Sequence, residues 1–248
     1  IESFENSDVC KPFFNWDGSY GIAFNVSENS PCQDKNLRLA IAYAVDSVSC
    51  LSAACDMRGE VATSWSFKTF FDYLDEWTDR PYFDYDMDKA KGYLADWEKE
   101  TGNKASDLSL NLLYQAEDVA EATALAVQNF IGVLTGNPNC VTLTSYDRGT
   151  YTSEKKSPTS FDITIVNGQL TTRTHSTYNW NAECNTEING YNIFHDYSGA
   201  IDKVIQPVMA IKTNSDETVR AFQEFIDENC YYKNLFYEVS YGACADWI

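Results

Sequence analysis

The chain has 248 residues, of which 37 are acidic and 18 basic, giving a formal net charge of −19 at pH 7. Hydrophobic residues make up 44% of it, enough for a substantial core and too many for disorder along the whole chain. A field this negative disfavours contact with nucleic-acid phosphates and with anionic lipid surfaces. No apolar run approaches the roughly 18 residues of a membrane span. No signal-peptide pattern is present. Because the sequence opens at Ile1 without methionine, the absence of this pattern gives no information about export.

The first readable strand covers residues 20–26, where Tyr20, Ile22, Phe24 and Val26 alternate to one side. After a break at residues 29–31, a helix is predicted from residue 36. The helix is expected to continue to the small residues at 51–55. The two charged residues of this helix are interpreted as structural. The apolar stripe of the helix consists of Leu37, Ile41, Val45 and Val48, and the two charged residues beside it are Arg38 and Asp46.

A second helix is predicted from residue 87 to residue 101, with Asp86 as its N-cap and Gly102 after its last turn. A strand at 108–114, a helix at 118–134, and strands at 141–144 and 161–166 follow, with a turn at 147–149 between the last two. A helix starting at Ser215 and a strand at 235–241 complete the pattern. This alternation predicts a single α/β domain with a mixed sheet flanked by helices.

Periodicity is absent between residues 171 and 198, a polar and aromatic stretch that holds both histidines. A loop of this length in a compact domain is typically functional or mobile. His175 and His195 have no metal-binding spacing, so both are expected to be solvated loop side chains.

Tests for catalytic and metal-binding patterns are negative. The acidic triplet Asp84, Asp86 and Asp88 fails the calcium-loop pattern, because Lys89 and Ala95 stand where glycine and glutamate are needed. There is no G-x-S-x-G nucleophile motif and no glycine-rich phosphate loop. We therefore expect a binding module without a cofactor or a metal, and not an enzyme.

The eight cysteines include no C-x-x-C pair, and neither histidine lies at zinc-finger spacing from two of them. Disulfides would fit a secreted protein, and buried thiols would fit an intracellular or anaerobic one. The sequence leaves both states open and assigns no pairing.

Several motifs, in one order along nearly the whole chain, resemble the extracellular solute-binding proteins of family 5. In that family a strand ending in Phe-Asn leads to a proline and then to D-x-x-V-R-x-A-l-x-y-A-i-D. The matching segments of this first motif are 22–25, Pro31 and 34–46. The segment 85–94 matches a second motif, in which Met87 replaces the family's proline. The strand 161–166, with its Phe161-Asp162, and the closing helix and strand at 219–236 also match.

The resemblance implies a two-lobed, periplasmic-binding-protein-like fold of which residues 1–248 form the C-terminal lobe, with the first lobe absent. It implies the substrate receptor of an ABC importer, extracellular and lipid-anchored, or periplasmic where an outer membrane exists. The implied ligand is a peptide or a related small polar solute, and the implied partners are the N-terminal lobe and the permease subunits, with no nucleic acid. Such a receptor closes on its ligand by hinge motion.

The resemblance places the ligand at the turn after the strand 161–166. Peptide receptors of the family carry there an Asp that binds the ligand's amino group, and this chain has no such residue. Glu183 or Glu187 could substitute, or the ligand could lack a free amino group. The candidate ligand-binding residues are Asn167, Gly168, Gln169, Leu170, Thr171, Thr172, Tyr178, Trp180 and Tyr191.

Two other functions stay open at the level of sequence. One is an extracellular hydrolase that uses carboxylates of the 171–198 loop. The other is an adhesive surface domain that has kept the fold and lost transport.

Overall fold

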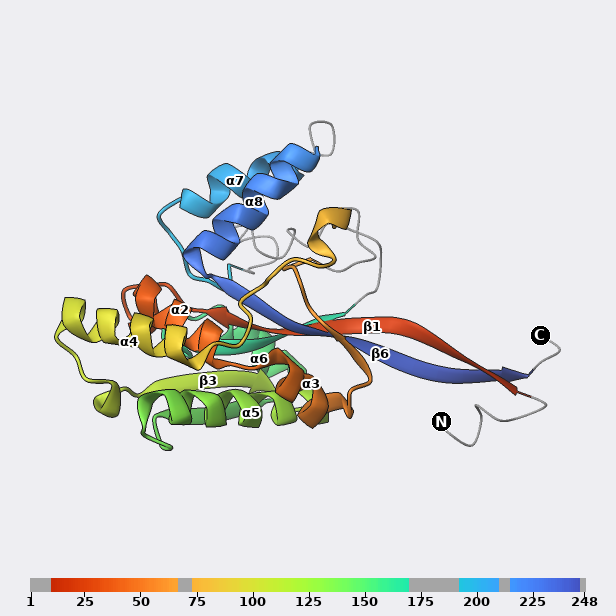
Figure 1. Cartoon of the computed structure of the whole chain (residues 1–248), viewed down its shortest axis with the longest axis horizontal. Coiled ribbons are helices and arrows are strands. Elements are labelled where there is room, and N and C mark those ends of the chain that lie inside the picture. Colours follow the sequence, from red (N-terminus) through yellow and green to blue (C-terminus); the bar gives the residue numbers. More distant parts are fainter. Residues whose placement is uncertain (1–9, 67–72, 170–191, 210–214, 246–248) are drawn as a thin grey trace.

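A computed structural model describes residues 10–66, 73–169, 192–209 and 215–245, and its centre is a six-stranded mixed sheet (Figure 1). The strand order is β2-β6-β1-β5-β3-β4. β3 runs parallel to β4 and β5, and β1 runs antiparallel to β5 and β6. This confirms the predicted fold class. The strands are β1 (Cys10–Phe24), β2 (Gly59–Val61), β3 (Leu110–Gln115), β4 (Val141–Tyr146), β5 (Ile163–Gln169) and β6 (Tyr232–Ala245).

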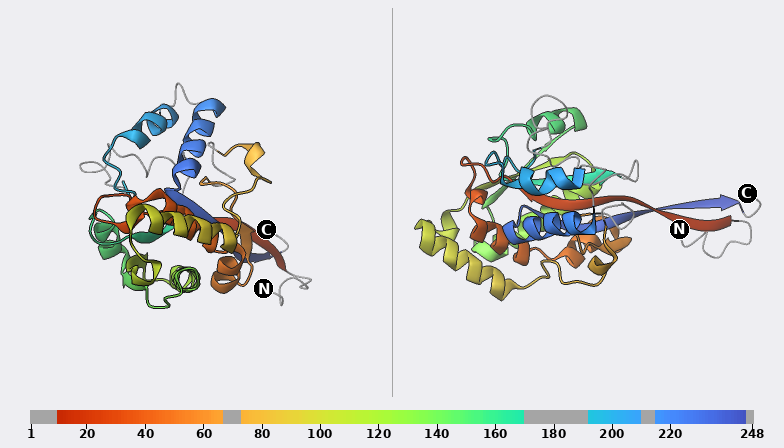
Figure 2. Two further views of the ribbon diagram at one scale, coloured as in Figure 1. Left: turned by 60° about the vertical axis from the view of Figure 1, so that its left-hand side comes forward. Right: turned by 90° about the horizontal axis from the view of Figure 1, so that it is seen from above.

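Helices cover both faces of the sheet, and each group of helices closes its own core (Figures 1 and 2). Tyr20, Ile22 and Phe24 of β1 join the core under α2 to α5, as their predicted alternation requires. Ala23 points to the other core, which contains apolar residues of α7 and α8. The helices are α2 (Lys35–Ala44), α3 (Ser47–Cys55), α4 (Met87–Thr101), α5 (Asp118–Thr135), α6 (Arg148–Glu154), α7 (Ala200–Met209) and α8 (Asp216–Asn229), with short 3-10 turns at Pro31–Gln33, Asp75–Trp77 and Ala105–Asp107.

β1 and β6 extend beyond the sheet as a two-stranded ribbon (Figure 1). β5 pairs with β1 only from Gly18 onward, so among the described residues the segment 10–17 of β1 pairs with β6 alone. The register between the two strands shifts between Trp16 and Gly18, where the ribbon leaves the sheet. A bulge at such a point bends and twists the ribbon relative to the sheet.

The single helix predicted from residue 36 to residue 55 is in fact two helices, α2 and α3. The chain breaks at Val45 and Asp46, and the Asp46 carboxylate caps α3 by accepting from the backbone N–H groups of Val48 and Ser49. Lys233, a β6 residue that is 1% exposed, donates from Nζ to the carbonyl oxygens of Ala42 and Val45 at 2.8 and 2.6 Å. The break turns Val48 out of the predicted stripe, and its side chain is 49% exposed.

The charged and polar residues of the family-like motifs hold the fold together. Arg38 is buried and donates to the carbonyl oxygens of Cys32, Gln33, Asn229 and Cys230, the last two at the end of α8. Five hydrogen bonds satisfy the buried guanidinium, which is the condition for burying such a charge. The interpretation of Arg38 as structural therefore agrees with its contacts.

Asp162, the aspartate of the predicted Phe-Asp strand, joins three segments. One carboxylate oxygen accepts from Ser30 Oγ at 2.7 Å and the other from the Asn111 backbone N–H at 2.8 Å. Asn25 donates to the carbonyl oxygens of Pro158 and Phe161 on the same side. These bonds tie the entry of β5 to β3 and to the end of β1, which fixes the register of the central strands.

Other elements also differ from the sequence-based predictions. β1 begins ten residues before Tyr20, and β6 runs from residue 232 to 245, because the two strands pair with each other along the ribbon. α6 replaces the turn predicted at 147–149, with Asp147 as its N-cap. α7 was not predicted, and its Pro207 interrupts the sequence signal of a helix.

In the described part of the chain, no single helix is long and apolar enough to cross a membrane. α2 and α3 reach that length and composition only as a pair, and the pair is bent by 58°.

Candidate functional site at the carboxyl edge of the sheet

The carboxyl ends of the parallel strands β3 and β5 meet at one edge of the sheet, and polar side chains gather there. Gln115 ends β3, Glu117 precedes α5, and Asn167 lies on β5. Tyr20 on β1 stands directly opposite Asn167 in the antiparallel register. Clefts at the carboxyl ends of parallel strands are the usual ligand sites of open α/β sheets.

These four side chains form one hydrogen-bond network centred on the Glu117 carboxylate. Asn167 Nδ2 donates to Glu117 Oε1 at 2.6 Å and to the Tyr20 hydroxyl oxygen at 3.1 Å. The Tyr20 hydroxyl donates to Glu117 Oε1 at 3.2 Å, and Gln115 Nε2 donates to Glu117 Oε2 at 3.0 Å. Since a carboxylate only accepts, the amide nitrogen of Asn167 must face it, and Asn167 Oδ1 keeps its acceptor capacity. No described residue donates to that oxygen.

The site is electrostatically negative. Burial and then the charges of Glu238 and Glu117 raise the pKa of Tyr20 well above its usual value, so the phenol keeps its proton and donates it. Within the described ranges Glu117 has no ion-pair partner. An edge that offers acceptors beside an unpaired carboxylate suits a ligand with donors or a positive charge.

The structure places part of the predicted site and leaves part of it outside the described residues. Asn167 lies at the carboxyl edge, within β5. Gly168 and Gln169 belong to the end of β5, where they pair with Ser19 and Gly18, so the predicted turn does not begin at residue 167. The remaining candidates lie outside the described residues: Leu170, Thr171, Thr172, Tyr178, Trp180 and Tyr191, with Glu183, Glu187 and His175.

Sequence reasoning missed Glu117, Tyr20 and Gln115 as members of this edge. Glu117 stands where a strand gives way to a helix, which is a recognisable sequence signal. Its proximity to Asn167 depends on β3 pairing with β5, which local patterns do not reveal.

The prediction that His195 is a solvated loop side chain is wrong. Its side chain packs against Phe161 and is 1% exposed, and its backbone has φ of 51°. Nδ1 lies 2.9 Å from the Tyr197 hydroxyl, and Nε2 has no hydrogen-bond partner in the described part of the chain. Burial lowers the pKa of His195 to about 4, so the ring is neutral at pH 7.

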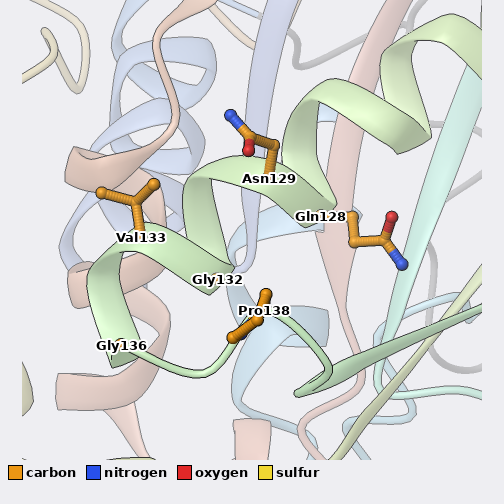
Figure 3. A pocket seen from close by; sticks show the side chains of 6 residues that line it. All are labelled: Gln128, Asn129, Gly132, Val133, Gly136 and Pro138. Atoms are coloured by element: carbon orange, nitrogen blue, oxygen red, sulfur yellow. The ribbon is translucent and has the colours of Figure 1, made fainter.

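A shallow pocket of about 280 Å³ lies elsewhere, at the C-terminal end of α5 (Figure 3). α5 runs back from the carboxyl edge, so this pocket is at the opposite edge of the sheet. The pocket is lined by Gln128, Asn129, Gly132, Val133, Gly136 and Pro138.

In the described residues no group of three or more His, Cys, Asp or Glu side chains could hold a metal ion.

The family model that matches the chain is that of bacterial extracellular solute-binding proteins, family 5 (middle region), over residues 11–189. The chain belongs to this family. Family 5 members are binding proteins of ABC importers, mostly for peptides, and the family is extracellular or periplasmic. A comparison with curated proteins gives no match.

Solved family 5 structures share the fold of this chain. The oligopeptide-binding protein AppA of Bacillus subtilis, in complex with a nonapeptide, matches with a TM-score of 0.76 and 21% identity, over 99% of this chain and 50% of its own. CtaP of Listeria monocytogenes, an ABC transporter substrate-binding protein, matches with a TM-score of 0.75 and 17% identity, over 99% of this chain and 49% of its own. OppA of Haemophilus influenzae, in complex with the peptide RPPGFSPFR, matches with a TM-score of 0.71 and 13% identity, over 94% of this chain and 45% of its own. The chain therefore spans about half the length of these proteins.

Proposed function

We propose that this chain is the C-terminal lobe of a lipid-anchored family 5 receptor that delivers a peptide, or a related small polar solute, to an ABC permease. The observation that carries the proposal is the match of 99% of this chain to half of an oligopeptide-binding protein. The β1–β6 ribbon is the natural connection to an N-terminal lobe, because it leaves the sheet beside the carboxyl edge. Closure would bring that lobe over Asn167 and Glu117.

In this proposal Glu117 takes the role that an aspartate plays after the equivalent of β5 in peptide receptors. A buried ligand ammonium needs acceptors to offset its lost hydration. Glu117 supplies the charge, and Asn167 Oδ1 and the Tyr20 hydroxyl oxygen supply neutral acceptors. The network through Tyr20, Gln115 and Asn167 holds the carboxylate in place before the ligand arrives, which reduces the entropic cost of binding.

The test is calorimetry with the two-lobed receptor and a peptide that it binds. Glu117→Gln keeps the shape of the side chain and removes its charge. We expect it to weaken binding of a peptide with a free amino terminus by about tenfold to a hundredfold, the cost of about 1.5–3 kcal/mol for a charged hydrogen bond. The same peptide with an acetylated amino terminus should bind both proteins equally weakly.

The matched control is Glu121→Gln, an exposed acid one turn further along α5. It makes the same change in net charge and should leave affinity within a factor of two. Unchanged affinity in Glu117→Gln would remove Glu117 from the binding site. The receptor proposal itself would fail if no peptide or small polar solute bound the unaltered two-lobed protein.

A further inference from the structure

A second carboxylate, that of Glu238 on β6, lies beside the Glu117 network on the same face of the sheet. Tyr20 of β1 stands opposite Phe236 of β6, and their rings stack at 5.4 Å in the core under α2 to α5. Glu238 follows Phe236 by two residues in regular pairing, so its side chain leaves the sheet on that same face. The cross-strand row that contains Glu238 is the next one toward the β1–β6 ribbon.

The two strands beside Glu238 contribute no side chain to its row. Its cross-strand neighbours are both glycines, Gly18 on β1 and Gly59 on β2. Glycine within a strand commonly marks a place where a ligand or another backbone comes close. Glu238 is partly exposed, whereas Phe236 in the preceding row is fully buried. The accessible part of this face therefore begins at Glu238.

Glu238 also lies near the Tyr20 hydroxyl. Burial, and next the charge of Glu238, are the largest causes that raise the pKa of Tyr20, ahead of the charge of Glu117, to which the hydroxyl donates at 3.2 Å. Burial and then the charge of Glu238 likewise raise the pKa of Cys55, the last residue of α3, to about 11. The carboxyl end of a helix carries partial negative charge. Glu238 is therefore close to both the hydroxyl and the end of α3, in surroundings that favour a cation.

We propose that Glu238 binds a cationic first side chain of the ligand, so that the receptor prefers peptides whose amino-terminal residue is lysine or arginine. This inference rests on the proposed function and names its substrate class. Glu117 takes the ammonium of the amino terminus, and Glu238 takes the charge at the end of the first side chain. Lysine carries that charge on a flexible four-carbon stem, and arginine can meet the carboxylate with two parallel hydrogen bonds.

Desolvation favours a ligand with two positive charges over a ligand with one. Closure of a second lobe over this edge removes water from both carboxylates, which costs free energy unless opposite charge replaces the water. The amino terminus of the ligand offsets that cost at Glu117, and a basic first side chain offsets it at Glu238. A net charge of −19 attracts such a ligand and repels peptides that begin with an acidic residue.

Calorimetry of the two-lobed receptor with two peptides that differ only in their first side chain tests the proposal. The peptides are Lys-Ala-Ala-Ala and norleucine-Ala-Ala-Ala, because norleucine keeps the length of the carbon stem and lacks the ammonium. We expect the lysine peptide to bind about tenfold more tightly, the usual weight of one charged hydrogen bond. This preference should shrink as salt is added, because salt screens the attraction.

Three variants separate the roles of the acids. Glu238→Gln should weaken the lysine peptide alone and bring the two affinities within a factor of two, while unchanged affinity for the norleucine peptide shows that the variant is folded. Glu117→Gln should weaken both peptides alike and keep the preference. The matched control is Glu60→Gln, an exposed acid on the neighbouring strand that pairs with Tyr237 and so faces the other side of the sheet. It should also keep the preference.

Equal affinity of the unaltered receptor for the two peptides would overturn the inference and leave the proposed function standing. The same holds if Glu238→Gln keeps the preference or weakens both peptides equally. A receptor that binds neither peptide would overturn the inference as well, and the proposed function falls with it if no other peptide or small polar solute binds.

Discussion

Lys233 shows how a single buried side chain can set the path of the backbone. Its ammonium group donates to the carbonyl oxygens of Ala42, Val45 and Phe83, all within 2.9 Å, and burial lowers its pKa to about 8. It is thus still charged at pH 7. Two of the three carbonyls are at the end of α2, where the helix would otherwise leave them unsatisfied.

Replacing this side chain with an apolar one of similar length should be costly. Lys233→Met leaves buried carbonyls without donors, and we expect a loss of about 3 kcal/mol in the free energy of unfolding. Urea denaturation followed by circular dichroism measures it. Lys91→Met on the exposed face of α4 is the control and should change stability by less than about 0.5 kcal/mol. Equal losses in both variants would contradict the role given to Lys233.

His195 should make stability depend on pH in the acidic range. Its pKa is about 4 in the folded chain and about 6.5 in the unfolded chain, so the unfolded state binds more protons between these values. Stability is therefore fully present above pH 6.5 and falls as the pH drops toward 4, by at most about 1.4 kcal/mol per pH unit from this group.

The variant His195→Asn isolates this contribution, since Asn tolerates the positive φ at this position. Asp227 titrates in the same window with the opposite sign, because burial raises its pKa to about 6. The informative quantity is therefore the difference in the free energy of unfolding between the unaltered chain and His195→Asn at each pH. Urea melts from pH 4 to 7 should show a shallower loss on acidification in the variant; parallel curves would mean that the ring is not buried neutral.

At the scale of elements, local periodicity predicted the helices whose ends are set by their own residues. α4 begins after its Asp86 cap and ends before Gly102, and α5 occupies the predicted segment almost residue for residue. The break between α2 and α3 escaped prediction because half of its cause, Lys233, is far away in the sequence. β1 and β6 were predicted too short for the same reason, since each is extended by pairing with the other.

The candidate site divides in the same way. Asn167 could be predicted because it follows an apolar strand and a family-like motif. Glu117 could not, because its approach to Asn167 requires the parallel pairing of β3 with β5. His195 was misjudged because it lies in a segment without periodicity, whereas Phe161, its neighbour in space, is far away in the sequence.

Asp46 gives a direct test of the break between α2 and α3. Its carboxylate accepts from two backbone N–H groups and from Ser49 Oγ at the start of α3. Asp46→Ala should lower the free energy of unfolding by about 1 kcal/mol, the usual cost of losing an N-cap. Asp46→Asn retains an acceptor and should lose less. A continuous α2–α3 helix would instead predict that alanine stabilises, because alanine is the better helix former.

In the molecule as a whole, five of the described cysteines are thiols within the core. Cys32, Cys50, Cys55, Cys140 and Cys230 are buried and free. Burial raises the pKa of Cys50 and Cys230 to about 12, which leaves them protonated and unreactive in the folded chain. Of the two states that the sequence left open, these five residues therefore adopt the buried-thiol state.

In the proposed function, this chain forms one side of a ligand clamp. Half of the burial of a ligand between two lobes is unavailable to one lobe, and affinity depends on that burial and on preorganisation. Calorimetry of one peptide against the isolated 248-residue chain and against the two-lobed receptor is the decisive measurement. We expect tight binding to the receptor and a dissociation constant for the isolated chain weaker by about a thousandfold or more. Nanomolar binding by the isolated chain would contradict it.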